Sequence, residues 1–336
     1  MKNILNKLFN HHTLDRAEAK DTLIKIAQGA FNESQVTAFI TVYMMRKITV
    51  DELQGFRDAM LEMCIPVDLA DYDTMDLCGT GGDGKDTFNI STLASFIVAG
   101  AGQAVAKHGN NGVSSVCGSS NLLQHFGYTF TNDVDDLRRN LDQANICFLH
   151  APLFHPAMKN VAPIRMQLGL KTFFNMLGPM VNPSFPRKQL VGVFSLELAR
   201  LYSYLYQQND MNYVILHALD GYDEISLTGD FKIISSNKES VLSPEDIGKK
   251  KVLAEDLKGG TTIKASAKIF EQILKGEGTR SQNDVVIANA GMALYAANPN
   301  LEIDEAMSQA EDSLKSGAAL ASFSKMLNKK TQIAKN

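Results

Sequence analysis

The residues with the clearest chemical potential lie in a glycine-rich stretch, residues 76–92, with the sequence DLCGTGGDGKDTFNIST. Four of the six residues 79–84 are glycines. Glycine lets backbone N–H groups approach an anion and permits positive φ, so such a loop can surround phosphate oxygens. Residues 89–92 then begin an apolar run that predicts a helix, whose N-terminal N–H groups also favour phosphate. The alternative for one such loop is a flexible turn before an ordinary helix.

The glycine spacing excludes two common nucleotide motifs. The stretch is not G-x-x-x-x-G-K-[ST], the phosphate loop of nucleoside triphosphatases. It is also not G-x-G-x-x-G with an acidic residue about 20 positions on, so a dinucleotide site is disfavoured.

A second donor-rich stretch covers residues 107–127, KHGNNGVSSVCGSSNLLQHFG. It combines a lysine, amides, hydroxyls and glycines and contains no acid, which suits another anionic group such as pyrophosphate. A solvated loop is the alternative, because Ser, Asn and Gly are common in loops. The donors are Lys107, His108, Asn110, Asn111, Ser114, Ser115, Ser119 and Ser120.

An acid pair and an arginine complete the candidate chemistry. Asp223 and Glu224 follow a strand candidate and could hold Mg²⁺, which prefers carboxylates together with substrate phosphates. Solvated acids in a turn are the alternative. Arg165 lies in an apolar, proline-punctuated segment, residues 153–183. Its planar guanidinium suits a carboxylate, although an ordinary surface arginine is equally compatible with the pattern.

The elements that must position these residues are those of an α/β protein. Short apolar runs at 74–78, 103–109, 146–152, 189–194, 212–219 and 231–235 alternate with helical patterns. This alternation predicts a mainly parallel sheet flanked by helices, with ligands at the carboxyl ends of the strands. Residues 1–65 show helical periodicity instead, and Thr49 with Glu52 forms a capping-box pattern. We therefore expect a small helical domain before the α/β domain.

Composition excludes several functional classes. The 336 residues are 45% apolar and 21% charged with a net charge of −4, which gives no general attraction to nucleic acid or anionic membranes. The four cysteines form no C-x-x-C pair, so we expect neither a zinc site nor disulfides. We recognise no secretion signal and no apolar run of the roughly 20 residues that a membrane helix needs. We expect a cytoplasmic protein.

The ordered motifs C-G-T-G-G-D (78–83), N-I-S-T (89–92), K-H-G-N (107–110), H-P-A-M…N-x-L-G-P…N-P (155–183) and D-G-Y-D-E (220–224) resemble the anthranilate phosphoribosyltransferase family. The resemblance covers nearly the whole chain. It implies transfer of the 5-phosphoribosyl group from phosphoribosyl pyrophosphate to the amine of anthranilate, in tryptophan biosynthesis. It also implies a homodimer, and association with an anthranilate synthase subunit is possible.

The resemblance also implies an arrangement of domains. A small helical domain (1–68), completed by helices within about 165–185, would adjoin an α/β phosphoribosyl-binding domain (72–330), with the active site in the cleft between them. Mg²⁺, expected as two ions per chain, would be held by Ser91, Asp223 and Glu224. Anthranilate would contact Gly79, Asn110 and Arg165. The sugar donor would contact Gly79, Gly82, Asp83, Thr87, Asn89, Ile90, Ser91, Thr92, Lys107, His108, Gly109, Asn110, Asn111, Gly112, Val113, Ser114, Ser115 and Ser119.

Two departures from the family pattern concern the acceptor side. Met166 stands where members often carry a second basic residue, and Lys171 stands where arginine is common. Two other functions remain open from the sequence. One is a pyrimidine nucleoside phosphorylase, which would need no acid pair to hold Mg²⁺ and pyrophosphate. The other is a non-catalytic relative that binds nucleic acid, which the acidic composition disfavours.

Overall fold

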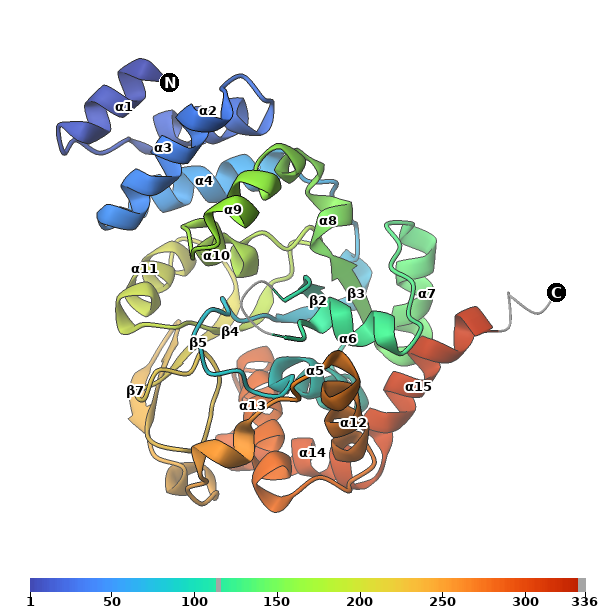
Figure 1. Ribbon diagram of the computed structural model, residues 1–336. Coiled ribbons are helices and arrows are strands. Elements are labelled where there is room, and N and C mark those ends of the chain that lie inside the picture. The colour runs from blue at the N-terminus through green and yellow to red at the C-terminus, as the bar shows by residue number, and fades with distance from the viewer. Residues whose placement is uncertain (113–115, 332–336) are drawn as a thin grey trace. The chain divides into compact units, whose positions relative to one another are not determined.

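The computed structural model describes residues 1–112 and 116–331, with side chains through residue 327. The chain forms two compact units, residues 1–67 with 151–185 and residues 68–150 with 186 onward (Figure 1). The segment that returns to the helical unit therefore begins at residue 151, earlier than the expected 165. The reason is that the third strand ends at His150 and the chain leaves the sheet there.

The helical unit is held together by capped helices around an aromatic core. Thr49 accepts a hydrogen bond from the Glu52 N–H and forms the predicted capping box. Phe39, Phe56 and Phe173 are fully buried. The helices are α1 (Lys2–Phe9), α2 (Arg16–Ala27), α3 (Glu33–Met45), α4 (Val50–Glu62), α8 (Ala151–Phe154), α9 (Ala162–Leu168) and α10 (Phe174–Leu177), with 3₁₀ turns at Pro156–Asn160 and Gly178–Met180.

Hydrogen bonds join the returning segment to the N-terminal part of the helical unit. The Ile65 N–H donates to the Phe154 carbonyl at 2.8 Å, and the Val67 N–H donates to the Pro183 carbonyl at 2.9 Å. The Asn160 side-chain amide donates to the Ala27 carbonyl at 2.7 Å. These bonds make residues 151–185 an integral part of the helical unit.

The second unit contains a seven-stranded sheet in the order β3-β2-β1-β4-β5-β6-β7. The first five strands in this order are parallel, and the last two pair antiparallel. The predicted α/β fold with a mainly parallel sheet is confirmed. The strands are β1 (Met75–Leu77), β2 (Val105–Gly109), β3 (Ile146–His150), β4 (Lys188–Gly192), β5 (Asn212–Ala218), β6 (Phe231–Ser235) and β7 (Glu239–Leu242).

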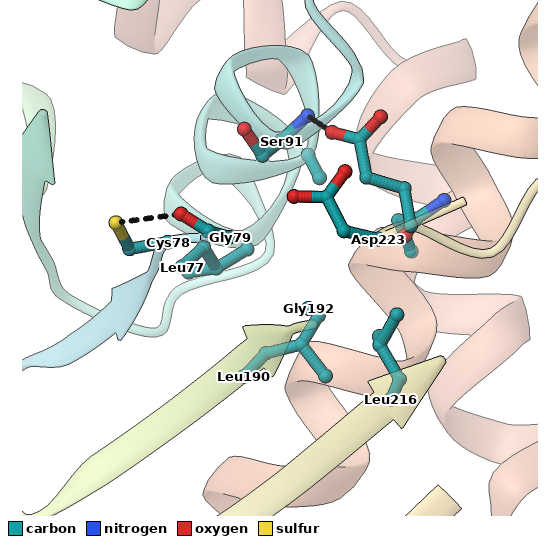
Figure 2. Close-up of a pocket in the computed structure, with 11 residues that line it drawn as sticks. Leu77, Cys78, Gly79, Ser91, Leu190, Gly192, Leu216 and Asp223 are labelled. Carbon is teal, nitrogen blue, oxygen red and sulfur yellow. Dashed lines mark hydrogen bonds between the residues drawn. The ribbon is translucent and has the colours of Figure 1, made fainter. Parts of the chain in front are cut away.

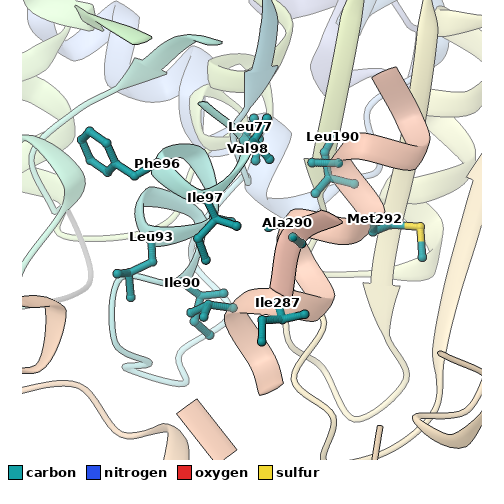
Figure 3. Close-up of a cluster of buried hydrophobic side chains, with 14 of the residues drawn as sticks. Leu77, Ile90, Leu93, Phe96, Ile97, Val98, Leu190, Ile287, Ala290 and Met292 are labelled. Carbon is teal, nitrogen blue, oxygen red and sulfur yellow. The ribbon is translucent and has the colours of Figure 1, made fainter. Parts of the chain in front are cut away.

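Helices pack against this sheet through a continuous apolar core. Figure 3 shows Ile90 and Ile97 of α5 on the side toward Ile287 and Ala290 of α13. The helices are α5 (Ile90–Gly100), α6 (Ser119–His125), α7 (Val134–Ala144), α11 (Leu196–Tyr206), α12 (Ile263–Leu274), α13 (Arg280–Ala297), α14 (Ile303–Lys315) and α15 (Ala318–Thr331), with 3₁₀ turns at Ala70–Tyr72, Glu245–Ile247 and Ala254–Leu257. Within the described chain, none of the helices has the length and apolarity to cross a membrane.

The strand order creates a switch point between β1 and β4. From β1 the chain moves outward through β2 to β3, and after the helical insertion it returns to β4 on the other side of β1. In open α/β sheets, ligands bind at the carboxyl ends of strands where the order reverses. The glycine-rich loop follows β1, and Gly192 ends β4, so both lie at this point.

Candidate active site

The glycine-rich loop is fixed to the neighbouring strand by its backbone. The Thr80 N–H donates to the Gly192 carbonyl at 2.9 Å. Gly81, Gly82 and Gly84 have φ of 62°, 77° and 75°, which other residues adopt only at a cost. The Gly81 N–H donates to the Asp223 carboxylate at 2.6 Å. The loop therefore presents an N–H group to a carboxylate in the structure, as expected of an anion-binding loop.

The N-terminus of α5 also holds a carboxylate. Glu224 accepts a hydrogen bond from the Ser91 N–H at 3.0 Å and one from the Thr87 hydroxyl at 3.3 Å. Figure 2 shows the Asp223 carboxylate beside the helix turn that carries Ser91, above the strand that ends at Gly192. The acid pair and two of the predicted anion-binding residues, Gly79 and Ser91, thus line one pocket, although more than 130 positions separate Ser91 from Glu224 in the chain.

The carboxylates in this pocket repel one another. Burial, and then the charge of Asp83, raises the pKa of Asp223 to about 7. Burial, and then the charges of Asp223 and Asp83, raises the pKa of Glu224. The charge of a nearby lysine partly opposes the rise in the pKa of Glu224, and a divalent cation bound to the acid pair would relieve the repulsion further.

That lysine is Lys107, which contacts two residues that line the pocket, Leu77 and Ser91. It is only 2% exposed, and its ammonium group donates to the Leu77 carbonyl and makes a long contact, 3.5 Å, with the Ser91 hydroxyl. Burial lowers its pKa. The next residue, His108, is also buried, and its N–H donates to the Asp76 carboxylate at 3.1 Å. Both residues therefore have contacts inside the protein.

The second donor-rich stretch folds back on itself through hydrogen bonds. The Asn110 carbonyl accepts from the Ser120 N–H at 3.2 Å and from the Ser119 hydroxyl at 3.3 Å. The Asn111 N–H donates to the Asn110 side chain at 2.8 Å, and the Gly112 N–H donates to the Asn121 side chain at 2.8 Å. The predicted contacts Val113, Ser114 and Ser115 lie outside the described residues.

Other predicted donor-site residues lie at the start of α5 or at the end of β2. The Asn89 amide donates to the Cys117 carbonyl at 2.8 Å. Ile90 is the first residue of α5, and Thr92 is buried in the same helix. Gly109 ends β2.

Two residues that position the acid pair, Gly192 and Asn289, were not predicted from the sequence. A Cβ atom on Gly192 would lie 1.6 Å from the Asp223 carbonyl oxygen, so only glycine lets the acid pair cross the end of β4. Asn289 of α13 accepts from the Ile225 N–H at 3.0 Å and donates to the Ile225 carbonyl at 2.9 Å. A lone amide in the apolar run VVIANAGMAL is a signal for it, because buried polar groups are nearly always paired.

Replacing Asn289 with Ala is expected to leave both Ile225 backbone groups unpaired in the interior. Each unsatisfied group costs about 1–3 kcal/mol, so the free energy of unfolding should fall by at least about 2 kcal/mol. The acid pair should also lose its fixed backbone, and turnover should fall. Urea unfolding and steady-state rates measure both effects. Asn283→Ala on the same helix, where the side chain contacts Gly278, is the control and should keep normal turnover.

Arg165 belongs to the helical unit, whereas the pocket belongs to the other unit. Its guanidinium lies 5.1 Å from the centre of the Phe174 ring, and burial lowers its pKa. Met166, at 80% exposed, and Lys171 are both at the surface. The two departures from the family pattern therefore lie on exposed positions beside a half-buried arginine.

The metal-binding potential rests on the acid pair. In residues 1–112 and 116–331, no three side chains of Asp, Glu, His or Cys group closely enough to hold a metal ion alone. Two carboxylates with a serine hydroxyl suit Mg²⁺, which keeps water and takes substrate phosphates as further ligands.

Two family models match the chain. Residues 71–320 match the glycosyl transferase family a/b domain, and residues 2–64 match the glycosyl transferase family helical bundle domain. Anthranilate phosphoribosyltransferase of Flavobacterium psychrophilum is 62% identical over 326 residues, which are 97% of this chain and 98% of that protein.

Solved structures agree with these matches. The anthranilate phosphoribosyltransferase of Thermus thermophilus aligns with a TM-score of 0.89 and 31% identity, over 96% of this chain and 98% of that one. The Saccharomyces cerevisiae enzyme in complex with PRPP and Mg aligns with a TM-score of 0.88 and 26% identity, over 98% of this chain and 97% of that one. The chain belongs to the anthranilate phosphoribosyltransferase family.

Proposed function

We infer that this protein transfers the 5-phosphoribosyl group from phosphoribosyl pyrophosphate to the amine of anthranilate, giving N-(5-phosphoribosyl)anthranilate and pyrophosphate in tryptophan biosynthesis. The observation that carries this inference is the meeting of the glycine-rich loop and the Asp223–Glu224 pair at the switch point of the sheet, in a chain 62% identical to a relative of that name. The comparisons support this function and not the phosphorylase or nucleic-acid-binding alternatives.

The donor would bind over the glycine-rich loop and the start of α5. Backbone N–H groups of the loop suit the 5-phosphate and the pyrophosphate, and the hydroxyls of Thr87, Ser91 and Thr92 suit the ribose and the metal. Mg²⁺ would be held by Asp223, Glu224 and Ser91, and we propose two ions per chain. When bound, it neutralises charge that develops on the departing pyrophosphate.

The chain's own residues contribute mainly positioning. Gly81 holds Asp223, and Ser91 and Thr87 hold Glu224, so both carboxylates are aimed before substrate arrives. Lys107 supports this arrangement by contacting Leu77 and Ser91, which line the same pocket. The aromatic amine of anthranilate is nucleophilic at neutral pH without a strong base, so prepositioned groups can supply most of the acceleration.

The proposed function is tested by following anthranilate fluorescence with the purified full chain. Fluorescence should fall only when the protein, phosphoribosyl pyrophosphate and Mg²⁺ are all present. An unchanged signal with folded protein and saturating Mg²⁺ would overturn the proposal and direct attention to nucleoside phosphorolysis.

Arg165 is proposed to pair with the anthranilate carboxylate, with Asn110 and Gly79 as further contacts. Arg165→Ala should raise the anthranilate KM about 10- to 100-fold, since a hydrogen bond to a charged group contributes about 1.5–3 kcal/mol. The KM for phosphoribosyl pyrophosphate should change less. Steady-state kinetics with each substrate varied in turn measures both values, with Arg200→Ala on the exposed side of α11 as control. A larger change in the donor KM would instead place Arg165 at the donor site.

We also propose that the protein is a cytoplasmic homodimer, with an anthranilate synthase subunit as a possible partner. The family resemblance supports these proposals. Light scattering coupled to size-exclusion chromatography tests the dimer, since a mass equal to the 36.8 kDa of one chain at micromolar concentration would refute it.

A further inference from the structure

A column of stacked aromatic rings in the helical unit ends at Arg165. The rings of Phe56 and Phe173 stack with centroids 4.6 Å apart, and those of Phe173 and Phe174 stack at 4.3 Å. The interplanar angles are 27° and 26°. The Arg165 guanidinium carbon then lies 5.1 Å from the Phe174 ring centre. Phe56 belongs to α4, Phe174 begins α10 and Phe173 precedes it, and Arg165 belongs to α9; these helices are labelled in Figure 1.

The surrounding residues fix the orientation of these rings. Phe56, Phe173 and Phe174 are 0%, 2% and 6% exposed, so none can rotate into solvent. Phe39 and Tyr43 make edge contacts with Phe173, at 6.2 and 5.2 Å. Close-packed interiors transmit position from one side chain to the next. The Phe174 ring is therefore a rigid support for whatever lies on it.

The arginine gains its local stabilisation from this support. Among the residues that the structure describes, no carboxylate offsets the effect of burial on the Arg165 guanidinium, whose pKa is lowered. The face of an aromatic ring attracts a cation through its quadrupole. This contact does not use the guanidinium N–H donors that would bind a carboxylate. The fork of N–H donors that suits a planar carboxylate thus has no anionic partner in the described chain.

We propose that Phe174 is a positioning residue for the acceptor substrate: its ring face holds the Arg165 guanidinium ready for an aromatic carboxylate. This inference rests on the proposed role of Arg165 in the transferase reaction. Phe174 acts through Arg165 and has no catalytic role of its own. It should therefore affect acceptor binding far more than donor binding.

The first test compares Phe174→Leu with Phe174→Tyr and Phe39→Leu in the full-length protein. Phe174→Leu should raise the anthranilate KM about 3- to 30-fold, the range of a partly desolvated cation–π contact. The donor KM should stay within about twofold on the same reasoning. Phe174→Tyr, which keeps a ring face, should restore the anthranilate KM. Phe39→Leu removes a ring that contacts Phe173 but not Phe174, so it should lower stability while raising the anthranilate KM clearly less than Phe174→Leu does.

The second test separates positioning from simple packing. In an Arg165→Ala background, Phe174→Leu should add no further rise in the anthranilate KM, because both changes remove one contact. An equal rise in both backgrounds would overturn the proposal. If Phe174→Leu does not fold, a series of fluorinated phenylalanines at 174 keeps the shape and weakens the ring quadrupole. The KM should rise along that series, and a flat series would also overturn the proposal.

The two tests distinguish failure of this inference from failure of the proposed function. If the unmodified protein does not consume anthranilate, the function itself is wrong. If it is active but its anthranilate KM does not change in Phe174→Leu or along the fluorinated series, only the role proposed for Phe174 is wrong.

Discussion

The double variant Asp223→Asn, Glu224→Gln is expected to lose at least about 100-fold in turnover, since charge stabilisation by a bound metal contributes several kcal/mol. Both amides are close in shape to the carboxylates, so the hydrogen bonds from Gly81 and Ser91 can persist while the charge is removed. The rate should also respond weakly to added Mg²⁺. Initial rates over a Mg²⁺ titration measure the effect, and a titration identical to that of the unmodified protein would refute the assignment.

A control for this variant lies in the same loop. Asp220 is exposed and accepts a hydrogen bond from the Thr228 hydroxyl. Asp220→Asn also removes one carboxylate from the connection between β5 and β6. It should leave turnover and the Mg²⁺ titration near those of the unmodified protein.

The same double variant should be more stable than the unmodified protein when metal is chelated at alkaline pH. Folding raises the pKa of Asp223 from 3.8 to about 7, and it also raises the pKa of Glu224. A carboxyl group with a raised folded-state pKa binds more protons folded than unfolded, so stability falls as pH rises through that window. Neutral amides escape this loss. The gain in free energy of unfolding, measured by urea unfolding, should therefore be larger at about pH 8 than near pH 4.

Much of the sheet could be predicted from the sequence because its strands are short, apolar and bounded by polar loops. Each of the six predicted runs overlaps a strand. The seventh strand, Glu239–Leu242, was missed, since it lies at the sheet edge and alternates exposed with half-buried residues. Edge strands bury little apolar surface, so they leave a weak pattern.

The residue types that make up the site could be predicted from the sequence, but the way in which the fold brings them together could not. Loops at strand ends indicate one edge of a sheet, but local sequence does not give the strand order. That order puts β4 between β1 and β5, so Asp223 must cross the end of β4 to reach the Gly81 N–H. The crossing depends on Gly192, whose significance is visible only once the distant backbone is in place.

Gly192→Ala is accordingly the second substitution with a large expected effect. The new Cβ would lie 1.6 Å from the Asp223 carbonyl oxygen and 2.7 Å from its carbonyl carbon. Both atoms are backbone, so no flexible side chain can move aside. Overpacking typically costs about 1–3 kcal/mol and occasionally more. Displacing the acid pair by about 1 Å could by itself lower turnover about 100-fold.

Stability and rate together test this prediction. Gly192→Ala should lower the midpoint of urea unfolding and also reduce turnover in the protein that remains folded, because relief of the clash has to shift either β4 or the acid pair. Gly229→Ala is the matched control, since its Cβ would meet only the Asp220 side chain, at 3.8 Å. A Gly192→Ala protein with normal stability and normal Mg²⁺-dependent turnover would show that the acid pair does not depend on this crossing. A variant with lowered stability but full turnover would show that Gly192 is needed for stability and not for the placement of the acid pair. Loss of both would tie the end of β4 directly to the placement of the carboxylates.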